Sequence, residues 1–133
     1  MTDPGVIRDE TGTQRLIGYV NDVSDPKNAR CWLDVDDRHL NRSGVLHGGI
    51  VATLLDSVSG VTASLTVDAS GRQPFVTLSL TTQFLAPGRT GRVEATARVT
   101  GGGRSTLFID GQLEHADGTL IATSTGVFKQ ARG

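Results

Sequence analysis

Cysteine and aromatic residues are scarce in this sequence of 133 residues, which holds one cysteine, one tryptophan and one tyrosine. The single cysteine, Cys31, excludes an intrachain disulfide framework and is typical of a reducing compartment, so we expect a cytoplasmic protein. The first residues lack a positive stretch followed by an apolar run, which predicts no secretory signal. No apolar segment approaches the roughly 20 residues that span a bilayer, so we expect no membrane partner.

An excess of charge of either sign is also missing. The formal net charge is −1, too small to hold nucleic acid, so we expect no nucleic-acid partner. Cys31 and the three histidines, His39, His47 and His115, show no ligand spacing, and we predict no metal site. The run Gly101–Gly103 lacks the Gly-Lys-Ser/Thr of a phosphate loop, and no cofactor is predicted.

Small residues are abundant instead. The chain has 17 glycines and a hydrophobic content of 37%, a composition that suits sheets and tight turns within one domain. Residues 1–13 are polar and carry proline and glycine, which predicts a flexible N-terminal tail. Residues 14–133 are then expected to form a single domain.

Hydrophobic periodicity predicts one long helix over residues 48–65. Ile50, Leu54, Val58 and Val61 recur at helical spacing, and Val51, Leu55 and Leu65 widen the stripe. So wide an apolar face indicates a helix that packs deep against a sheet.

Strands are predicted by strict alternation of apolar and polar residues. Cys31, Leu33 and Val35 alternate with polar neighbours over residues 30–35. Four further strands are expected at residues 75–85, 92–100, 105–115 and 119–129, joined by glycine-containing turns. Strands segregated from a single helix indicate an α+β fold, in which an antiparallel sheet wraps around one central helix.

Two glycines directly precede the apolar part of this helix, although glycine weakens a helix by roughly 0.5–1 kcal/mol relative to alanine. They suit a place where a ligand approaches bare backbone. The first N–H groups of a helix lack intrahelical partners and lie at its positive end. Gly48 and Gly49 are therefore candidate donors to a carbonyl oxygen on which negative charge develops, a role typically worth on the order of 3 kcal/mol.

Asp56 is the second unusual residue, because a carboxylate inside an apolar helix is costly when it is unpaired. Its neighbours at helical spacing are small, which leaves room for a substrate: Ala52, Ser59, Gly60 and Ala63. Thr77 or Ser79, on the strand after the helix, is a candidate hydroxyl partner. The alternative is a carboxylate that faces solvent or is capped by a nearby serine.

Helix geometry also predicts the assembly. His47 and Asp56 are nine residues apart, which corresponds to roughly 13 Å of helical rise and about half a rotation. If both act on one carbonyl, the site must be shared between two chains packed antiparallel, as an isologous dimer provides.

The pattern of Asn41, then His47, Gly48 and Gly49, then Asp56 resembles the hotdog-fold acyl-CoA thioesterase superfamily. It is most similar to the phenylacetyl-CoA thioesterase-like branch, which includes proteins like human thioesterase superfamily member 2. The similarity runs from about residue 16 to residue 129 and includes the stretch Phe-Val-Thr-Leu at residues 75–78 and Pro-Gly at residues 87–88.

The resemblance implies hydrolysis of a small aryl- or medium-chain acyl-CoA by a cofactor-free enzyme. Asp56 would be the nucleophile or general base, and the Gly48 N–H would polarise the thioester carbonyl. His47 would shape the turn, Asn41 would position water or the carbonyl, and Thr77 would lie beside the attacking water. The resemblance further implies a homodimer or a dimer of dimers, with Asp56 and Thr77 facing the partner's Asn41, His47 and Gly48.

Coenzyme A phosphates meet scattered basic residues in this family, so Arg104, Arg89 and Arg72 are candidates to bind them, with Gly49 as a further contact to the substrate. Two rival functions stay open. One is a dehydratase that acts on hydroxyacyl thioesters, which requires a histidine close to the carboxylate. The other is an acyl-CoA binding protein without turnover. Asn41 has a structural alternative, an Asx turn in its loop, and Thr77 has another, an ordinary strand threonine.

Overall fold

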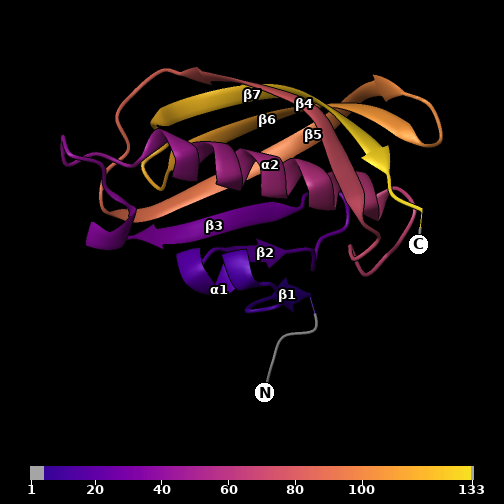
Figure 1. The fold of residues 1–133 in the computed structure, drawn as a ribbon, viewed down its shortest axis with the longest axis horizontal. Helices are drawn as coiled ribbons and strands as arrows, with labels where there is room; N and C mark the ends of the chain where they lie inside the picture. The colour runs from indigo at the N-terminus through magenta and orange to yellow at the C-terminus, as the bar shows by residue number, and fades with distance from the viewer. Residues whose placement is uncertain (1–4, 133) are drawn as a thin grey trace.

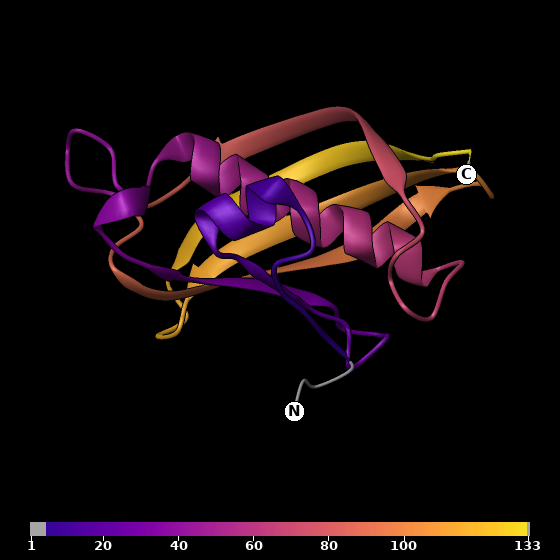
Figure 2. The same cartoon turned by 60° about the horizontal axis from the view of Figure 1, so that its bottom comes forward.

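An antiparallel sheet of seven strands wraps around one long helix in the computed structural model, which describes residues 5–132 (Figures 1 and 2). The strands are β1 (Val6–Ile7), β2 (Val20–Asp22), β3 (Arg30–Val35), β4 (Phe75–Phe84), β5 (Gly91–Gly102), β6 (Thr106–His115) and β7 (Leu120–Gln130). The helices are α1 (Gly12–Ile17), the short 3-10 helix η1 (Asp37–His39) and α2 (Gly48–Leu65). The α+β hotdog fold and the bounds of the central helix are confirmed.

The strand order is β1-β2-β3-β5-β6-β7-β4. Helix α2 connects β3 to β4, so the chain crosses the inner face of the sheet to reach its far edge (Figure 1). The five strands predicted by alternation all form. On β3 the predicted inward residues Cys31, Leu33 and Val35 are buried, and on β5 Val93 and Ala95 are buried.

The core lies between α2 and the inner face of the sheet. Val51, Leu54, Leu55 and Val58 of α2 are almost fully buried there, and each contributes roughly 1.5–3 kcal/mol of hydrophobic stabilisation. Gly111 on β6 lets the helix come close: a Cβ at this position would lie 2.7 Å from Ser124 Oγ and 3.4 Å from Leu55 Cδ2. Small residues on the sheet are therefore a packing requirement.

Among the described residues, helix α2 is long and apolar enough to meet the criteria for a membrane-spanning helix. Its 18 residues have a mean hydropathy of 1.3, which by length and composition suffices to cross a bilayer. By length and composition, the expectation that no apolar segment approaches the roughly 20 residues that span a bilayer is therefore wrong. Its apolar side faces the sheet and its other side carries Asp56, as in the core helix of a globular domain.

The N-terminal region differs from the predicted flexible tail. Residues 1–4 lie outside the described part, but β1 pairs with β2 and α1 begins at Gly12. The Gln14 side chain, 2% exposed, fixes this region because its Nε2 donates to the carbonyls of Ile7 (2.7 Å) and Tyr19 (3.1 Å). The hydrophobic pattern did not predict this, because a buried glutamine that bonds nearby backbone carbonyls adds nothing to the periodicity of apolar residues.

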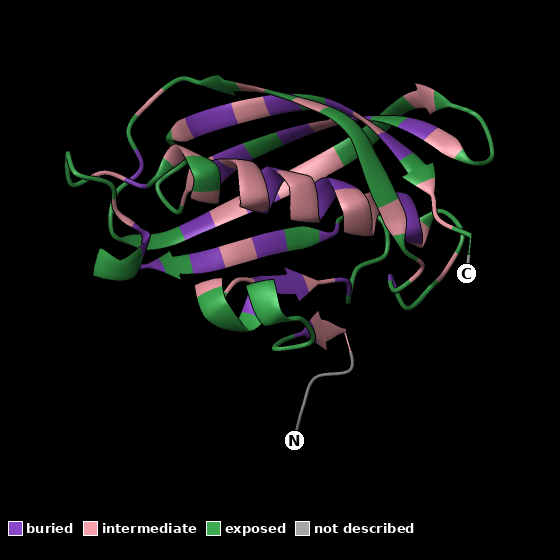
Figure 3. Cartoon of the chain, viewed as in Figure 1, coloured by how far each residue is buried: buried purple, intermediate pink, exposed green. Residues whose placement is uncertain are grey.

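Strand β4 forms one edge of the sheet and is mostly exposed (Figure 3). Its pairing with β7 contains a bulge: Thr77 lies opposite Phe128 and Ser79 lies opposite Val127, so Leu78 is the extra residue. Because an extra residue reverses the side of the sheet to which later side chains point, Thr77 and Leu80 both face α2. Ser79 points to the outer face, which rules it out as the partner of Asp56.

His47 caps the N-terminus of α2. Its Nδ1 accepts a hydrogen bond of 2.8 Å from the Gly49 N–H, and its own N–H donates to the His39 carbonyl. His39 is itself buried: its Nδ1 accepts from the Asp36 N–H, and its Nε2 bonds the carbonyl of Ile17. The start of α2 is thus tied to η1 and to the end of α1.

Replacing His47 is expected to weaken this cap. His47→Ala leaves the Gly49 N–H without its acceptor and should lower the free energy of unfolding by about 1 kcal/mol. His47→Asn supplies another side-chain acceptor and is the matched control, with a loss of under about 0.5 kcal/mol. Urea unfolding at a fixed protein concentration measures both, and equal stabilities for the two variants would contradict the capping role.

Candidate active site

Asp56 and Thr77 form a bonded pair on the side of α2 that faces away from the main core. The Thr77 hydroxyl donates to Asp56 Oδ1 at 2.6 Å, and the bulge that follows Thr77 in β4 turns Ser79 away from the helix. The other carboxylate oxygen, Oδ2, has no hydrogen-bond donor among residues 5–132. Asp56 is half-buried, so its carboxylate is fixed at one oxygen and accessible at the other.

A hollow of about 600 Å³ lies beside this carboxylate. Gly60 borders it, and a Cβ at Gly60 would meet no atom within 4 Å, which leaves the hollow open at that side of α2. Ser59 and Ala63, small neighbours of Asp56 expected to leave room for a substrate, are instead fully buried. Room for a ligand therefore comes from Gly60 and the space between α1, α2 and β4.

The N-terminus of α2 offers one free backbone donor. The Gly49 N–H is occupied by His47 Nδ1, which corrects the expectation that both glycines donate to a ligand. The Gly48 N–H has no acceptor within residues 5–132. No acidic side chain lies in the first turn, so the positive end of the helix dipole is not neutralised there.

Asn41 lies in the loop that leads to α2. Its Oδ1 accepts from the N–H groups of Ser43 (2.9 Å) and Val45 (3.2 Å), so the Asx turn foreseen as the structural alternative is present. Its Nδ2 has no acceptor in the described part of the chain and can donate to a ligand. Asn41 therefore shapes its loop with one end of the amide and leaves the other end available.

Asn41 and Gly48 line a second hollow, of about 460 Å³. Its other walls are apolar and include Leu46 and Phe84, and Phe84 is 59% exposed. This second hollow is distinct from the one that Asp56 and Thr77 line. Gly48 and Asp56 are eight positions apart on α2, or about 12 Å along its axis. One carbonyl cannot contact both residues of the same chain.

The three predicted phosphate-binding arginines are separated. Arg72 is held by Glu10 through three hydrogen bonds of 2.7–3.1 Å, and this pairing with Arg72 lowers the pKa of Glu10. Arg89 and Arg104 lie just beyond opposite ends of β5, whose 12 residues span roughly 40 Å. Arg72 is thus already neutralised, and the three arginines form no cluster within one chain.

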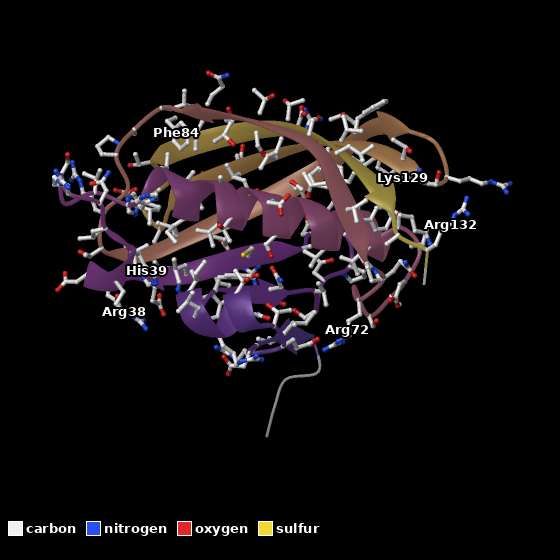
Figure 4. All side chains as sticks on the ribbon, viewed as in Figure 1. Arg38, His39, Arg72, Phe84, Lys129 and Arg132 are labelled. Atoms are coloured by element: carbon white, nitrogen blue, oxygen red, sulfur yellow. The ribbon has the colours of Figure 1, made fainter. Side chains whose placement is uncertain are left out.

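Sequence reasoning missed residues beside Asp56 and others near Arg104. Tyr19 and Ser57 line the hollow beside Asp56, where α1 brings Tyr19 against the helix. Lys129 and Arg132 lie at the same end of the molecule, far from Phe84 (Figure 4), and Lys129 is close to the β5–β6 turn that carries Arg104. No local signal marks these positions, because each depends on contacts between segments distant in the sequence.

Comparison with known proteins gives a consistent result. A family model described as thioesterase superfamily matches residues 43–122. The chain is 33% identical to human acyl-coenzyme A thioesterase 13 over 112 residues, which cover 82% of this chain and 78% of that protein.

Two solved structures share the fold. The PaaI protein of the Escherichia coli phenylacetic acid degradation operon is 23% identical, with a TM-score of 0.80 over 93% of this chain and 87% of that one. A Bacillus halodurans protein solved with CoA is 24% identical, with a TM-score of 0.84 over 96% and 83%. The family predicted from the motif at Asn41, His47–Gly49 and Asp56 is confirmed: the chain belongs to the thioesterase superfamily.

Proposed function

We propose that this thioester hydrolase acts on acyl-CoA and releases a free acid and coenzyme A. The observation that carries the proposal is the Asp56 carboxylate, held by Thr77 at one oxygen and open to a hollow at the other. The similarity to human acyl-coenzyme A thioesterase 13 supports coenzyme A as the thiol.

In the proposed reaction the free oxygen of Asp56 either attacks the thioester carbon or removes a proton from an attacking water. The C–S bond breaks, and the thiolate leaves and takes up a proton. In the first route water then cleaves the anhydride between the acyl group and Asp56, which releases the acid and restores the carboxylate; in the second route the attacking water oxygen enters the acid directly. Thr77 holds Oδ1 and thereby orients Oδ2 toward the reacting carbon. The Gly48 N–H donates to the carbonyl oxygen as it becomes negative, at the uncompensated end of the helix dipole.

The complete site requires a homodimer. Strand β4 is an edge with one side unpaired, and it exposes apolar side chains that favour a covering surface: Val76, Leu78 and Phe84. It runs from Thr77, beside Asp56, to Phe84, whose ring lies 3.4 Å from a Cβ built on Gly48. Antiparallel pairing of two β4 strands about an axis near Leu80 would bring Asp56 close to the partner's Gly48.

A dimer accounts for two separate hollows in one chain, since each would supply half of a site. Light scattering is expected to give at least twice the 14.0 kDa of one chain.

The pairing of two dimers into a tetramer stays a prediction. The cytoplasmic location also stays a prediction, and a single free cysteine supports it, since such a thiol is typical of a reducing compartment. Cys31 is buried, and burial raises the pKa of its thiol to about 12.

Two observations weigh against the rival functions. None of the described residues of the same chain that line the hollow beside Asp56 is a histidine, and His47, which the proposed dimer brings near Asp56, already uses its Nδ1 to cap α2, whereas dehydration of a hydroxyacyl thioester needs an acid–base pair at one place. For a binding protein without turnover, an accessible carboxylate oxygen beside a neutral thioester adds no affinity. Hydrolysis is the reaction that uses both this oxygen and the free Gly48 N–H.

Asp56→Asn is expected to lower kcat for thiol release from the best acyl-CoA at least about a hundredfold, roughly 2.7 kcal/mol of barrier, with little change in substrate affinity. Asp110→Asn removes a carboxylate from the outer face of the sheet and should leave the rate unchanged. Acyl-CoAs from acetyl to palmitoyl, with phenylacetyl and hydroxybenzoyl, form the panel. Binding of these ligands without thiol release by the wild-type protein would sink the hydrolase proposal.

Gly48→Pro tests the backbone donor. Proline fits the first position of a helix and removes only the N–H that has no intrahelical acceptor, so kcat should fall about a hundredfold. Gly48→Ala keeps the N–H and adds a Cβ at ordinary contact distance, 3.4 Å, from Phe84, so its loss should stay under about tenfold. Equal losses in the two variants would refute a role for this N–H.

A further inference from the structure

Pro87 and Gly88 stand at the centre of the segment between β4 and β5, residues 85–90 (the 85–90 loop). This loop lies at the same end of the molecule as the start of α2 and the turn between β6 and β7 (Figures 1 and 2). Both residues line the hollow that contains Gly48. The loop is therefore part of the surroundings of the free Gly48 N–H, and the contacts that fix the loop bear on that donor.

Gly88 joins the loop to the residues that lead into α2. Its carbonyl accepts a 2.9 Å hydrogen bond from the N–H of Leu46, which lies shortly before Gly48 in the chain. Gly88 is buried, and a Cβ on it would lie 2.7 Å from the Leu46 Cβ, so a larger residue would push the two backbones apart. Leu46 is 4% exposed and belongs to the main core. A shift of the loop would thus reach the start of α2 through Leu46.

His115, the last residue of β6, holds the other side of the loop. Its Nε2 accepts a 3.0 Å hydrogen bond from the N–H of Arg89, the residue after Gly88. The β6–β7 turn fixes the His115 backbone, because its N–H donates to the Thr119 carbonyl and its carbonyl accepts from the Gly118 N–H, both at 2.9 Å. The imidazole is therefore an acceptor carried by a hydrogen-bonded hairpin.

The two halves of the loop are held in different ways. The N–H groups of Leu85 and Ala86 donate to the Ile121 carbonyl on β7, at 2.8 and 3.1 Å, and these backbone bonds do not depend on side-chain identity or charge. The second half depends on the His115 ring, since the Arg89 N–H bonds a side chain. Loss of that ring as an acceptor would release this half alone.

The bond to Arg89 requires a neutral imidazole. A backbone N–H can only donate, so Nε2 must offer its lone pair, and the proton of the neutral ring lies on Nδ1. A protonated ring carries hydrogen on both nitrogens and cannot accept. The charged side chains that line the same hollow as His115 are Arg89, Arg92 and Asp117, and Arg92 is paired with Asp34. The bond is therefore present while His115 is neutral and is lost as the ring takes up a proton at lower pH.

We propose that His115 is a positioning residue that orients the Gly48 N–H through the 85–90 loop. It holds the Arg89 N–H, which keeps Gly88 against Leu46 and fixes the approach to α2. His115 is not among the described residues that line the Gly48 hollow, so it acts through the loop and not on the substrate. This inference rests on the proposed function, in which the Gly48 N–H polarises the thioester carbonyl.

Leucine and glutamine at position 115 form a matched pair of variants. His115→Leu removes the acceptor and should lower kcat about fivefold at about pH 8, the effect of one hydrogen bond, with KM within about twofold, because the Gly48 contact strengthens in the transition state. His115→Gln carries an amide oxygen that can accept from the Arg89 N–H and should keep kcat within about twofold. Equal losses in the two variants would overturn the proposal.

A double-mutant cycle with Gly48→Pro separates positioning from a general loss of stability. Gly48→Pro has no N–H to orient, so adding His115→Leu should lower its kcat by less than about twofold further. A merely structural role would carry the same fivefold loss into this background. Additive losses would therefore overturn the proposal.

The requirement for a neutral ring is tested between about pH 8 and pH 5.5, the range in which histidines titrate. The ratio of wild-type kcat to that of His115→Gln should fall about fivefold on acidification, since only the wild type loses its acceptor. The ratio cancels the titration of Asp56 and His47, which both proteins share. A constant ratio over this range would contradict the proposal.

Absence of thiol release from every acyl-CoA would instead refute the proposed function. The role of His115 is then decided by NMR of the 15N-labelled protein. The amide signals of Gly48 and Arg89, each taken as the difference between the wild type and His115→Gln, should move with one common pH midpoint. Movement of the Arg89 signal alone would overturn the link to Gly48.

Discussion

The apolar side of α2 lies against the inner face of the sheet, and this contact fixes where every candidate functional group is found. Val51, Leu54, Leu55 and Val58 face the strands, so Asp56 must point the other way, toward β4 and α1. The same packing directs the N-terminus of α2, with its free Gly48 N–H, to the opposite end of β4. Small residues such as Gly111 allow the close approach that this arrangement needs.

A rigid helix also imposes a limit. Asp56 and Gly48 stand about 12 Å apart along the axis and line different hollows, so under the proposed function one chain holds two incomplete halves of a site. The exposed edge strand β4 runs between these halves. Pairing across that edge would convert both halves into complete sites, and the proposed function therefore depends on association.

Alternation and helical periodicity predicted the core elements because α2, β3 and β5 each bury one side. The same reasoning failed for β1 and α1, which are short and are anchored by Gln14, a buried polar residue bonded to the carbonyls of Ile7 and Tyr19. Asn41, Gly48 and Asp56 were found through a local motif. The separation of Gly48 from Gly49 as donors was not foreseen, because it depends on which ring nitrogen of His47 faces the helix.

Thr77 and Ser79 could not be distinguished from sequence, since a single bulge in β4 decides which of them faces Asp56. Tyr19 and the pairing of Arg72 with Glu10 likewise depend on how the N-terminal region folds over α2. Long-range contacts thus determine the walls of the hollow, while local patterns determine the carboxylate and the helix that carries it.

The sharing of one site between two chains is the central claim, and mixing two inactive variants tests it most directly. Asp56→Asn and Gly48→Pro, unfolded together and refolded, form hybrid dimers in which one site carries both substitutions and the other carries neither. Random pairing should then restore about a quarter of the wild-type activity. If Asp56 and Gly48 of the same chain act on one thioester, no intact site can form, and the mixture would remain as inactive as each variant alone.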